Sequence, residues 1–266
     1  MKGARVRIGR IHYANLFPIF HSLEKIARSR QYEFVGGVPS AVNKLLRAGE
    51  VHVSPSSSIE YLRHEEIYGL LEGHSISSRG PIGSILLFSK RPIETLDGLV
   101  ILTSSQSETS VALLNIILTK FYDFQCTLKS TSAPLSKGME SHSAYMLIGD
   151  DALREALRWP RLYIYDLGDI WYRNTGLPFV FALWIARNDF RSGEPVLFEE
   201  FRKDLDAAKI EALKDLKGIA RESSLITVLS ESEIVSYWQG ISYDLDDGHK
   251  KGLELFKKYA SELKLL

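Results

Sequence analysis

Cysteine is almost absent from this sequence of 266 residues, in which Cys126 is the only one. A single cysteine excludes an internal disulfide framework and any metal or iron–sulfur site that needs several thiolates. The histidines show neither of the metal-binding spacings HxxxH and HExxH, so we expect neither a metal nor another cofactor. The motifs GxGxxG, GxxxxGK[ST] and GxSxG are also missing, which excludes the common dinucleotide, phosphate-loop and nucleophile-elbow signatures.

An excess of charge of one sign is missing as well. The chain has 33 Lys and Arg against 33 Asp and Glu, so no whole-chain basic field favours a nucleic-acid partner. No apolar run approaches the roughly 18 residues of a membrane span, so none is predicted. The basic residues at the N-terminus are not followed by the apolar stretch of a secretory signal, and we expect a cytoplasmic protein.

The hydrophobic pattern of the chain alternates between short β-rich runs and amphipathic helices. Such alternation predicts an α/β fold with a mostly parallel sheet. The chain becomes helical after about residue 195, in segments near 195–223, 230–239 and 247–264. The predicted strands are residues 5–9, 32–36, 51–54, 85–88, 99–102, 145–148, 162–165 and 179–186.

Two of these strands suggest a division into lobes. The apolar runs 85–89 and 179–187 bracket a block long enough to form a small α/β lobe. We therefore predict one lobe from residues 1–88 plus 188–266 and a second from residues 89–187, with a ligand cleft between them. The pattern alone favours a single doubly wound domain equally well.

Hydroxyl side chains gather at three predicted turns, in residues 54–58, 75–80 and 103–110. Six of the eight residues in the last cluster are Ser or Thr. Hydroxyls and free backbone N–H groups at a helix N-terminus bind carboxylates well. Helix capping is the simpler alternative, but it explains only one hydroxyl in each cluster.

Two single residues are further candidates for a ligand site. Asn15 follows the first strand and either faces a ligand or caps the next helix. Ser84 stands at a glycine-rich entry to a strand, where it either faces a ligand or is merely small. Cys126 has the surroundings of a buried hydrophobic residue rather than of a nucleophile.

The opening motif IGRIHYANLFP and four further motifs follow one another along the chain in the order expected for a known family. By these motifs the chain resembles the chorismate dehydratases of the futalosine route to menaquinone. The five stretches are residues 8–18, 49–63, 75–89, 147–153 and 166–184.

This resemblance implies a two-lobed type II periplasmic-binding-protein-like fold that has become an enzyme. The implied reaction, a carbon–oxygen lyase reaction, removes water from chorismate to give 3-[(1-carboxyvinyl)oxy]benzoate, with the substrate's enolpyruvyl carboxylate as the base. Asn15 and Ser84 match the family's catalytic positions. Substrate contacts are expected from Ser56, Ser57, Gly83, Ser107, Thr109 and Ser110.

Two departures from the family pattern and two other functions stay open. His12, Tyr13 and Ala14 precede Asn15 where other residues are common, and Arg79 stands where an acidic or amide residue is frequent. Arg79 is either an extra carboxylate partner or a solvated surface residue. The alternative functions are a non-catalytic solute-binding protein and the 1,4-dihydroxy-6-naphthoate synthase of the same pathway, which usually needs a protein base.

Overall fold

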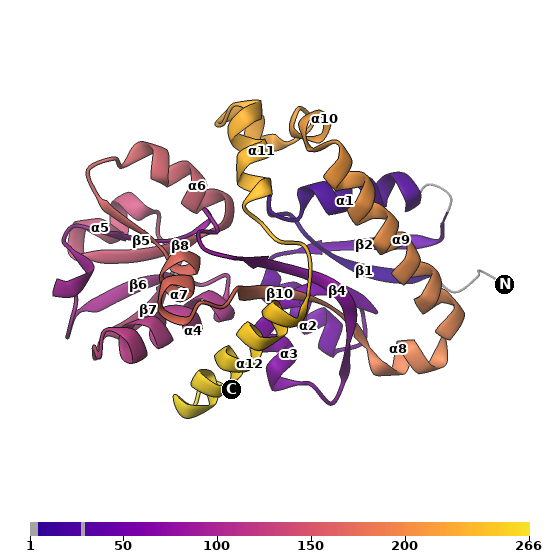
Figure 1. The fold of residues 1–266 in the computed structure, drawn as a ribbon, viewed down its shortest axis with the longest axis horizontal. Coiled ribbons are helices and arrows are strands. Elements are labelled where there is room, and N and C mark those ends of the chain that lie inside the picture. The colour runs from indigo at the N-terminus through magenta and orange to yellow at the C-terminus, as the bar shows by residue number, and fades with distance from the viewer. Residues whose placement is uncertain (1–4, 28–29) are drawn as a thin grey trace. The chain divides into compact units, whose positions relative to one another are not determined.

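The computed structural model describes residues 5–27 and 30–266. Their contacts divide the chain into two units, and each unit is assembled from segments that are distant in sequence. Unit 1 comprises Met1–Ile76, Ala182–Gln239 and Tyr243–Leu245, and unit 2 comprises Ser77–Phe181, Gly240–Ser242 and Asp246–Leu266. The chain passes from unit 1 to unit 2 within one strand and returns within another (Figure 1).

Unit 1 is built on a mixed sheet in the strand order β2-β1-β3-β10-β4. Strands β1, β2 and β3 are parallel, whereas β10 runs antiparallel to β3. Its strands and helices are β1 Val6–Ile11, α1 Phe17–Ala27, β2 Tyr32–Gly37, α2 Pro39–Arg47, β3 Val53–Ser57, α3 Ser58–Arg63, β4 Tyr68–Ser78, β10 Phe179–Arg187, α8 Asn188–Gly193, α9 Pro195–Lys214, α10 Leu216–Ala220 and α11 Glu231–Gln239.

Helices pack closely on this sheet. Phe20 of α1 and Phe201 of α9 pack on Trp184 of β10, with ring centroids 5.6 and 6.1 Å from it. Gly9 lets α2 approach β1, because a Cβ there would lie 2.5 Å from Cγ1 of Val42 and 2.6 Å from Oγ of Ser54. This close approach packs Val42 of α2 against the middle of β1.

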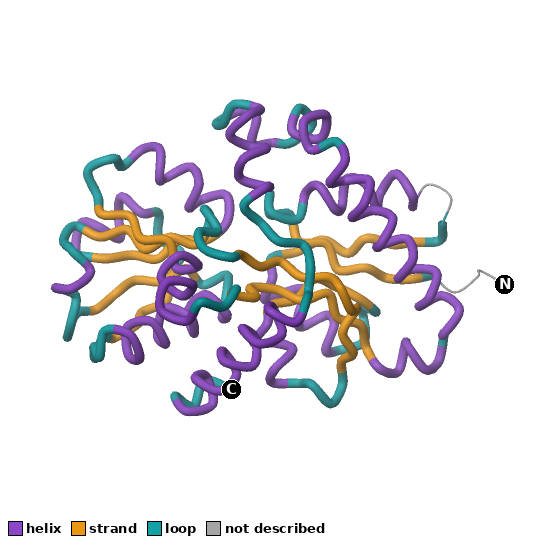
Figure 2. The backbone as a smooth tube through the Cα atoms, in the orientation of Figure 1, coloured by secondary structure: helices purple, strands orange, loops and turns teal. Residues whose placement is uncertain are grey.

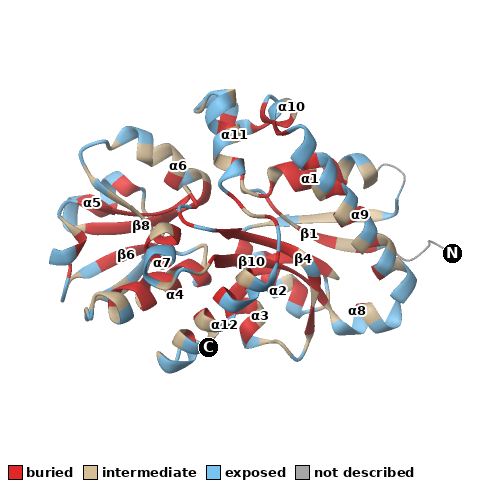
Figure 3. Ribbon diagram, in the orientation of Figure 1, coloured by how far each residue is buried: buried red, intermediate tan, exposed pale blue. Residues whose placement is uncertain are grey.

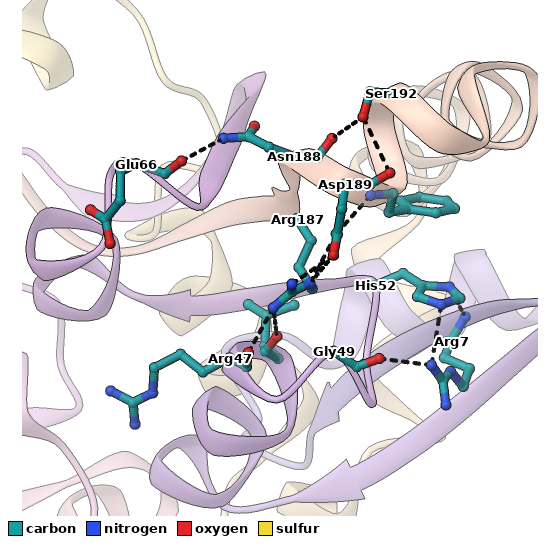
Figure 4. A network of polar contacts seen from close by, with 11 residues as sticks. Arg7, Arg47, Gly49, His52, Glu66, Arg187, Asn188, Asp189 and Ser192 are labelled. Atoms are coloured by element: carbon teal, nitrogen blue, oxygen red, sulfur yellow. Dashed lines mark hydrogen bonds and ion pairs between the residues drawn. The ribbon is translucent and has the colours of Figure 1, made fainter.

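At the edge of unit 1 where β3 begins, arginines tie the elements together (Figure 4). The Arg187 guanidinium binds Asp189 and donates from Nη1 to the carbonyls of Leu46 and Arg47, at 3.1 and 2.6 Å. These two carbonyls belong to the last turn of α2, which a cation stabilises. Arg7 makes a similar bond of 2.8 Å to the carbonyl of Gly49.

His52 lies beside this network in a neutral form. Its Nδ1 accepts the backbone N–H of Arg7 at 3.2 Å, and its ring stacks on Phe190 with centroids 4.7 Å apart. Burial lowers the pKa of His52 below its ordinary 6.5, and the Arg7 charge lowers it further.

The pH dependence of stability follows from this lowered pKa. Below about pH 6.5 the unfolded chain takes up a proton on His52 that the folded chain resists, so the free energy of unfolding falls with falling pH. The His52→Gln variant does not titrate, so we expect a smaller fall between pH 7 and pH 5. Denaturant unfolding at several pH values measures both slopes. Equal slopes in the two proteins would show that His52 titrates normally.

Unit 2 is built on a second mixed sheet, in the order β7-β6-β8-β5-β9, which Figure 2 draws in orange. Strand β6 is parallel to β7 and β8, whereas β5 runs antiparallel to β8 and β9. Its strands and helices are β5 Ile85–Ser89, β6 Val100–Ser104, α4 Glu108–Ile116, β7 Thr127–Thr131, α5 Leu135–Ser141, β8 Ala144–Ile148, α6 Gly149–Arg158, β9 Tyr163–Asp166, α7 Leu167–Thr175 and α12 Asp247–Glu262.

The core of unit 2 lies on both faces of this sheet. Strands β5 and β8 are buried along their whole length, and Figure 3 shows the buried residues of β8 in red. One apolar cluster combines Phe88, Leu102 and Tyr145 with residues of α5 and α6. An aromatic cluster includes Trp171 and Phe179, whose ring centroids are 5.1 Å apart.

The α/β class predicted from the sequence is confirmed, but five details differ. The sheets are mixed rather than mostly parallel. Strand β4 was not predicted, and the crossing takes place within it rather than at residues 85–89, which form β5 inside unit 2. Residues 246–266 belong to unit 2 rather than to the predicted first lobe, because Phe256 of α12 packs on Phe179, with ring centroids 5.0 Å apart. Residues 77–88 also lie in unit 2, and the cleft between lobes stays a prediction.

Candidate functional site

The predicted site residues of unit 1 lie at one edge of its sheet. Parallel neighbours end at the same edge, and β1 and β3 are such a pair, with Ile8 opposite Val53. Asn15 follows the end of β1 by four residues, whereas Ser56 and Ser57 are the last residues of β3. The fold therefore brings Asn15, Ser56 and Ser57 to the carboxyl edge of the sheet.

The loop that carries Asn15 is fixed through its backbone. The hydroxyl of Tyr243 donates to the carbonyl of Asn15 at 2.8 Å, and Trp238 Nε1 donates to the carbonyl of Ala14 at 2.8 Å. Burial raises the pKa of Tyr243 well above its usual range, so this donor keeps its proton. The position of Asn15 thus does not depend on its own side chain.

The side chain of Asn15 does not cap helix α1. Its Oδ1 is buried and has no hydrogen-bond partner among the described residues. A helix cap needs this oxygen to accept a backbone N–H of the first turn. The sequence left open whether Asn15 caps α1 or faces a ligand, and this arrangement favours an amide that binds a ligand.

The two serines of β3 differ in their hydrogen bonds. Ser56 is fully buried, and its Oγ has no partner within the described chain. Ser57 Oγ accepts a hydrogen bond of 3.1 Å from Nδ2 of Asn43, and it caps no N–H of helix α3. Asn43 was not predicted as a site residue, although a lone amide between Val42 and Leu46 on the buried face of α2 is a visible signal.

The predicted site residues of unit 2 also share one sheet edge. Strands β6 and β8 end there because they are parallel, and β5 begins there because it is antiparallel to β8, with Ile85 opposite Ile148. Gly83 and Ser84 immediately precede β5. Helix α4 begins four residues after β6. Ser107 directly precedes this helix, and Thr109 and Ser110 lie in its first turn.

Asp166 holds the turn that carries Ser84. Its carboxylate accepts the backbone N–H groups of Gly83 at 2.6 Å and Ile82 at 3.1 Å, and it also caps helix α7 by accepting those of Gly168 and Asp169. Gly83 has a φ of +77°, which glycine adopts without the strain that a Cβ would bring. Ser84 itself is 1% exposed, and its carbonyl accepts the N–H of Gly149 at 2.7 Å.

The environment of Asp166 combines burial with four donors. Burial raises the pKa of its carboxyl group, whereas the four N–H groups oppose that rise. The sequence did not single out Asp166, because its partners Ile82 and Gly83 lie more than eighty residues away. Its position at the end of β9 and before an amphipathic helix would have indicated a helix cap only.

The Asp166→Asn variant is expected to loosen this turn. The amide keeps the shape of the carboxylate but cannot accept the Gly83 N–H on its nitrogen. Losing a hydrogen bond to a charged group costs about 1.5–3 kcal/mol, so the free energy of unfolding should fall by that order. Denaturant unfolding measures the change. The neighbouring Asp169→Asn is the control, because its ion pair with Arg173, whose side chain is 76% exposed, is worth at most about 0.5 kcal/mol. Equal losses in both variants would contradict a specific role for Asp166.

In the hydroxyl-rich turn, capping accounts for Ser107. Ser107 is the N-cap of α4, where its Oγ accepts the N–H of Ser110 at 3.2 Å. Thr109 and Ser110 are buried, at 1% and 2% exposure. Contact of these three residues with a substrate stays a prediction.

The Ser107→Ala variant should therefore lose stability. Removal of an N-cap costs about 1 kcal/mol, which chemical denaturation resolves. Ser105→Ala is the matched control, because the exposed Ser105 lies in the same turn and its loss should change stability by less than about 0.5 kcal/mol. Unchanged stability in Ser107→Ala would show that the cap contributes nothing.

A pocket of about 260 Å³ opens at the same edge of unit 2. Ser104, Ser105 and Gln106 line it, whereas Ser107, Thr109 and Ser110 are not among its lining residues in the described chain. The first half of the hydroxyl-rich turn thus lines this pocket, and the second half does not. The other lining residues are Thr131, Ser132, Ala133, Pro134, Leu135, Tyr145, Leu147, Asp151 and Glu155.

The contacts of the other residues considered in the sequence point to structural rather than catalytic roles. Arg79 forms an ion pair of 2.6 Å with Asp246, which makes the surface role the observed one. Cys126 donates to the carbonyl of Leu96, and burial raises the pKa of its thiol, so it is no activated nucleophile. His12 and Glu108 are both exposed.

The site residues of both units share one chemical property. Asn, Ser, Thr and Gly are neutral at every ordinary pH, and they offer hydrogen bonds without a strong base. Within residues 5–27 and 30–266, no group of three or more His, Cys, Asp or Glu is arranged to hold a metal ion. None of the helices in that part of the chain has the length and apolar character of a membrane crossing. The arrangement suits binding and orientation of an anion.

Known proteins resemble this chain in sequence and in fold. A family model described as menaquinone biosynthesis matches residues 6–262. The chorismate dehydratase of Thermus thermophilus is 30% identical over 271 residues, which cover 94% of this chain and 93% of that protein.

Two solved structures share the fold at lower identity. A protein from Archaeoglobus fulgidus superposes with a TM-score of 0.81 at 17% identity, with both chains fully covered. The alkanesulfonate-binding protein SsuA from Xanthomonas axonopodis superposes with a TM-score of 0.73 at 13% identity, covering 100% of this chain and 95% of that one. These two structures show the fold, and the family model and the Thermus thermophilus relative confirm the resemblance found in the sequence.

Proposed function

The chain belongs to the menaquinone biosynthesis family and has a periplasmic-binding-protein-like fold, and we propose that it is a chorismate dehydratase. The observation that carries the proposal is the relationship to the chorismate dehydratase of Thermus thermophilus along almost the whole of both chains. The reaction is a carbon–oxygen lyase reaction that converts chorismate to 3-[(1-carboxyvinyl)oxy]benzoate and water.

The chemistry of the reaction fits neutral site residues. Chorismate loses the proton from ring carbon 3 and the hydroxyl group from ring carbon 4, and these two leave as one water molecule. The ring becomes aromatic, which drives the elimination forward. We propose that the enolpyruvyl carboxylate of the substrate takes the proton, as the family resemblance implies, so that the protein need not supply a base.

In this proposal the protein acts by orientation and by stabilising charge. Asn15 offers a buried acceptor, Oδ1, that lacks a donor among the described residues, and the hydroxyl group of chorismate is a donor of the right kind. Ser84 stands on a turn that Asp166 holds rigid. Donors and acceptors fixed in advance lower the barrier without reorganising during the reaction.

The two carboxylates of chorismate need hydrogen-bond donors, and in this proposal those donors are neutral groups that are not strong bases. We propose that hydroxyl groups supply these donors, among them the buried hydroxyls of Ser56 and Ser57 in unit 1 and of Thr109 and Ser110 in unit 2. We also propose a cytoplasmic location, because a dianionic intermediate crosses a lipid bilayer poorly and is consumed where it is made.

The test incubates purified protein with chorismate. Ultraviolet absorbance follows the new aromatic ring, and mass spectrometry identifies a product lighter by one water. A sample without protein corrects for spontaneous aromatisation. Chorismate that is bound but unchanged would identify a solute-binding protein, and neither binding nor turnover would overturn the proposal in favour of another activity of the family.

A further inference from the structure

Asn43 is a buried polar residue that the proposed mechanism leaves unused. It lies on the inner face of α2 between Val42 and Leu46, which are both fully buried, and is itself only 7% exposed. Its Oδ1 has no partner among the described residues, and its Nδ2 makes the hydrogen bond to Ser57. A buried amide with one bond is less stabilising than an apolar side chain, so that bond must account for its presence.

The direction of this bond decides what the Ser57 hydroxyl can do. Because Nδ2 only donates, Ser57 Oγ is the acceptor, and the hydroxyl proton must point elsewhere. Ser57 caps no N–H of α3, and no residue of the described chain accepts its proton. A ligand carboxylate, which only accepts, is the complementary partner.

We propose that Asn43 is a positioning residue that holds the Ser57 hydroxyl as a donor to a substrate carboxylate. The proposal rests on the function proposed above, because it takes the ligand to be the chorismate dianion. Asn43 contacts Ser57 and acts on the substrate through it. In its absence the Ser57 hydroxyl is free to rotate and to donate to other acceptors, so binding loses the oriented bond.

A double-mutant cycle tests whether Asn43 acts through Ser57. The four proteins are the parent, Asn43→Ala, Ser57→Ala and the double variant, and calorimetry gives the Kd for chorismate. Loss of one bond to a charged group raises Kd about ten- to hundredfold, so we expect that increase in Ser57→Ala and up to the same increase in Asn43→Ala. The double variant should bind no more weakly than Ser57→Ala. If the increase in Kd of the double variant equalled the product of the two single increases, Asn43 and Ser57 would act independently, which would overturn the proposal.

The Asn43→Asp variant tests the direction of the bond. An ionised carboxylate has the same shape but accepts the Ser57 proton, so Kd should rise at least as much as in Asn43→Ala. Lowering the pH protonates the new carboxyl group and restores a donor, so we expect binding to recover in this variant relative to the parent. An unchanged Kd at pH 7 would show that Ser57 donates to residue 43, which overturns the proposal.

Asn188→Ala is the matched control. It also removes one Nδ2 bond to an oxygen of unit 1, the 3.1 Å bond to the carbonyl of Glu66, but at the opposite edge of the sheet (Figure 4). We expect its Kd to equal that of the parent. Because calorimetry needs no turnover, a parent that binds chorismate without converting it would refute the proposed function alone, and the cycle would still decide the role of Asn43. A parent that does not bind chorismate would refute both.

Discussion

In the Asn15→Ala variant, turnover of chorismate is expected to fall by about 10²–10³, the usual effect of removing a well-placed hydrogen-bonding group in an active site. The Michaelis constant should change less than the turnover rate, because the amide acts mainly in the transition state. The fold should persist, since Tyr243 and Trp238 hold the loop through backbone carbonyls that alanine keeps. Steady-state kinetics and a melting curve of the same sample measure both effects.

The opposite pattern would contradict a catalytic Asn15. If this residue capped α1, its loss would cost about 1 kcal/mol of stability while activity remained. The free Oδ1 argues against that pattern. Near-normal turnover together with a lowered melting temperature would decide for the cap.

The Ser84→Ala variant is expected to lose activity to a similar extent, about 10²–10³ in turnover. The substitution leaves the turn intact, because Gly149 binds the Ser84 carbonyl and Asp166 binds Gly83 and Ile82. The effect should therefore appear in the turnover rate rather than in stability. Kinetics at saturating chorismate, with circular dichroism as a check on folding, measure it.

Ser89→Ala provides the control for Ser84. Ser84 directly precedes β5, and Ser89 is the fully buried last residue of that strand. Its Oγ donates to the carbonyl of Arg91 at 2.6 Å. It lies at the other end of the strand, so its loss should reduce stability and leave turnover unchanged. Equal losses of turnover in both variants would mean that losing a hydroxyl at either end of β5 disturbs the enzyme, and Ser84 would have no special role.

The sequence predicted the elements whose burial is continuous. Strands β5, β8 and β10 consist of long apolar runs, and a run of that kind is recognisable without any knowledge of its neighbours. The family resemblance added the fold, which periodicity alone left open. Local pattern was sufficient where the environment of a residue is apolar on both sides.

Strand β4 could not be predicted because its partners are remote. It contains two glycines and several serines, which are typical of a turn. The backbone of residues 242–244 pairs with it: Ser77 exchanges hydrogen bonds with Ser242, and Ser75 Oγ donates to the carbonyl of Asp244. The serines identified as a hydroxyl cluster are thus strand residues that bind the backbone of a distant segment.

The site followed the same rule. Motifs predict Asn15 and Ser84 as site residues, whereas the sequence did not indicate Asp166 and Asn43, because their hydrogen bonds reach other parts of the chain. Asp166 reaches Gly83 from 83 positions away, and Asn43 reaches Ser57 from the preceding helix. A sequence shows that such residues are polar, but the direction of their bonds becomes visible only in three dimensions.

The hydrogen bond from Tyr243 to the carbonyl of Asn15 has a consequence for the synthesis of the protein on the ribosome. The two residues are separated by 228 positions, and the last helix of unit 2 is made after Tyr243. A nascent chain therefore synthesises its proposed catalytic asparagine almost first and receives the group that anchors it almost last. Truncated translation products that end before Tyr243 lack this anchor, so we expect the enzyme to gain activity only when synthesis is nearly complete.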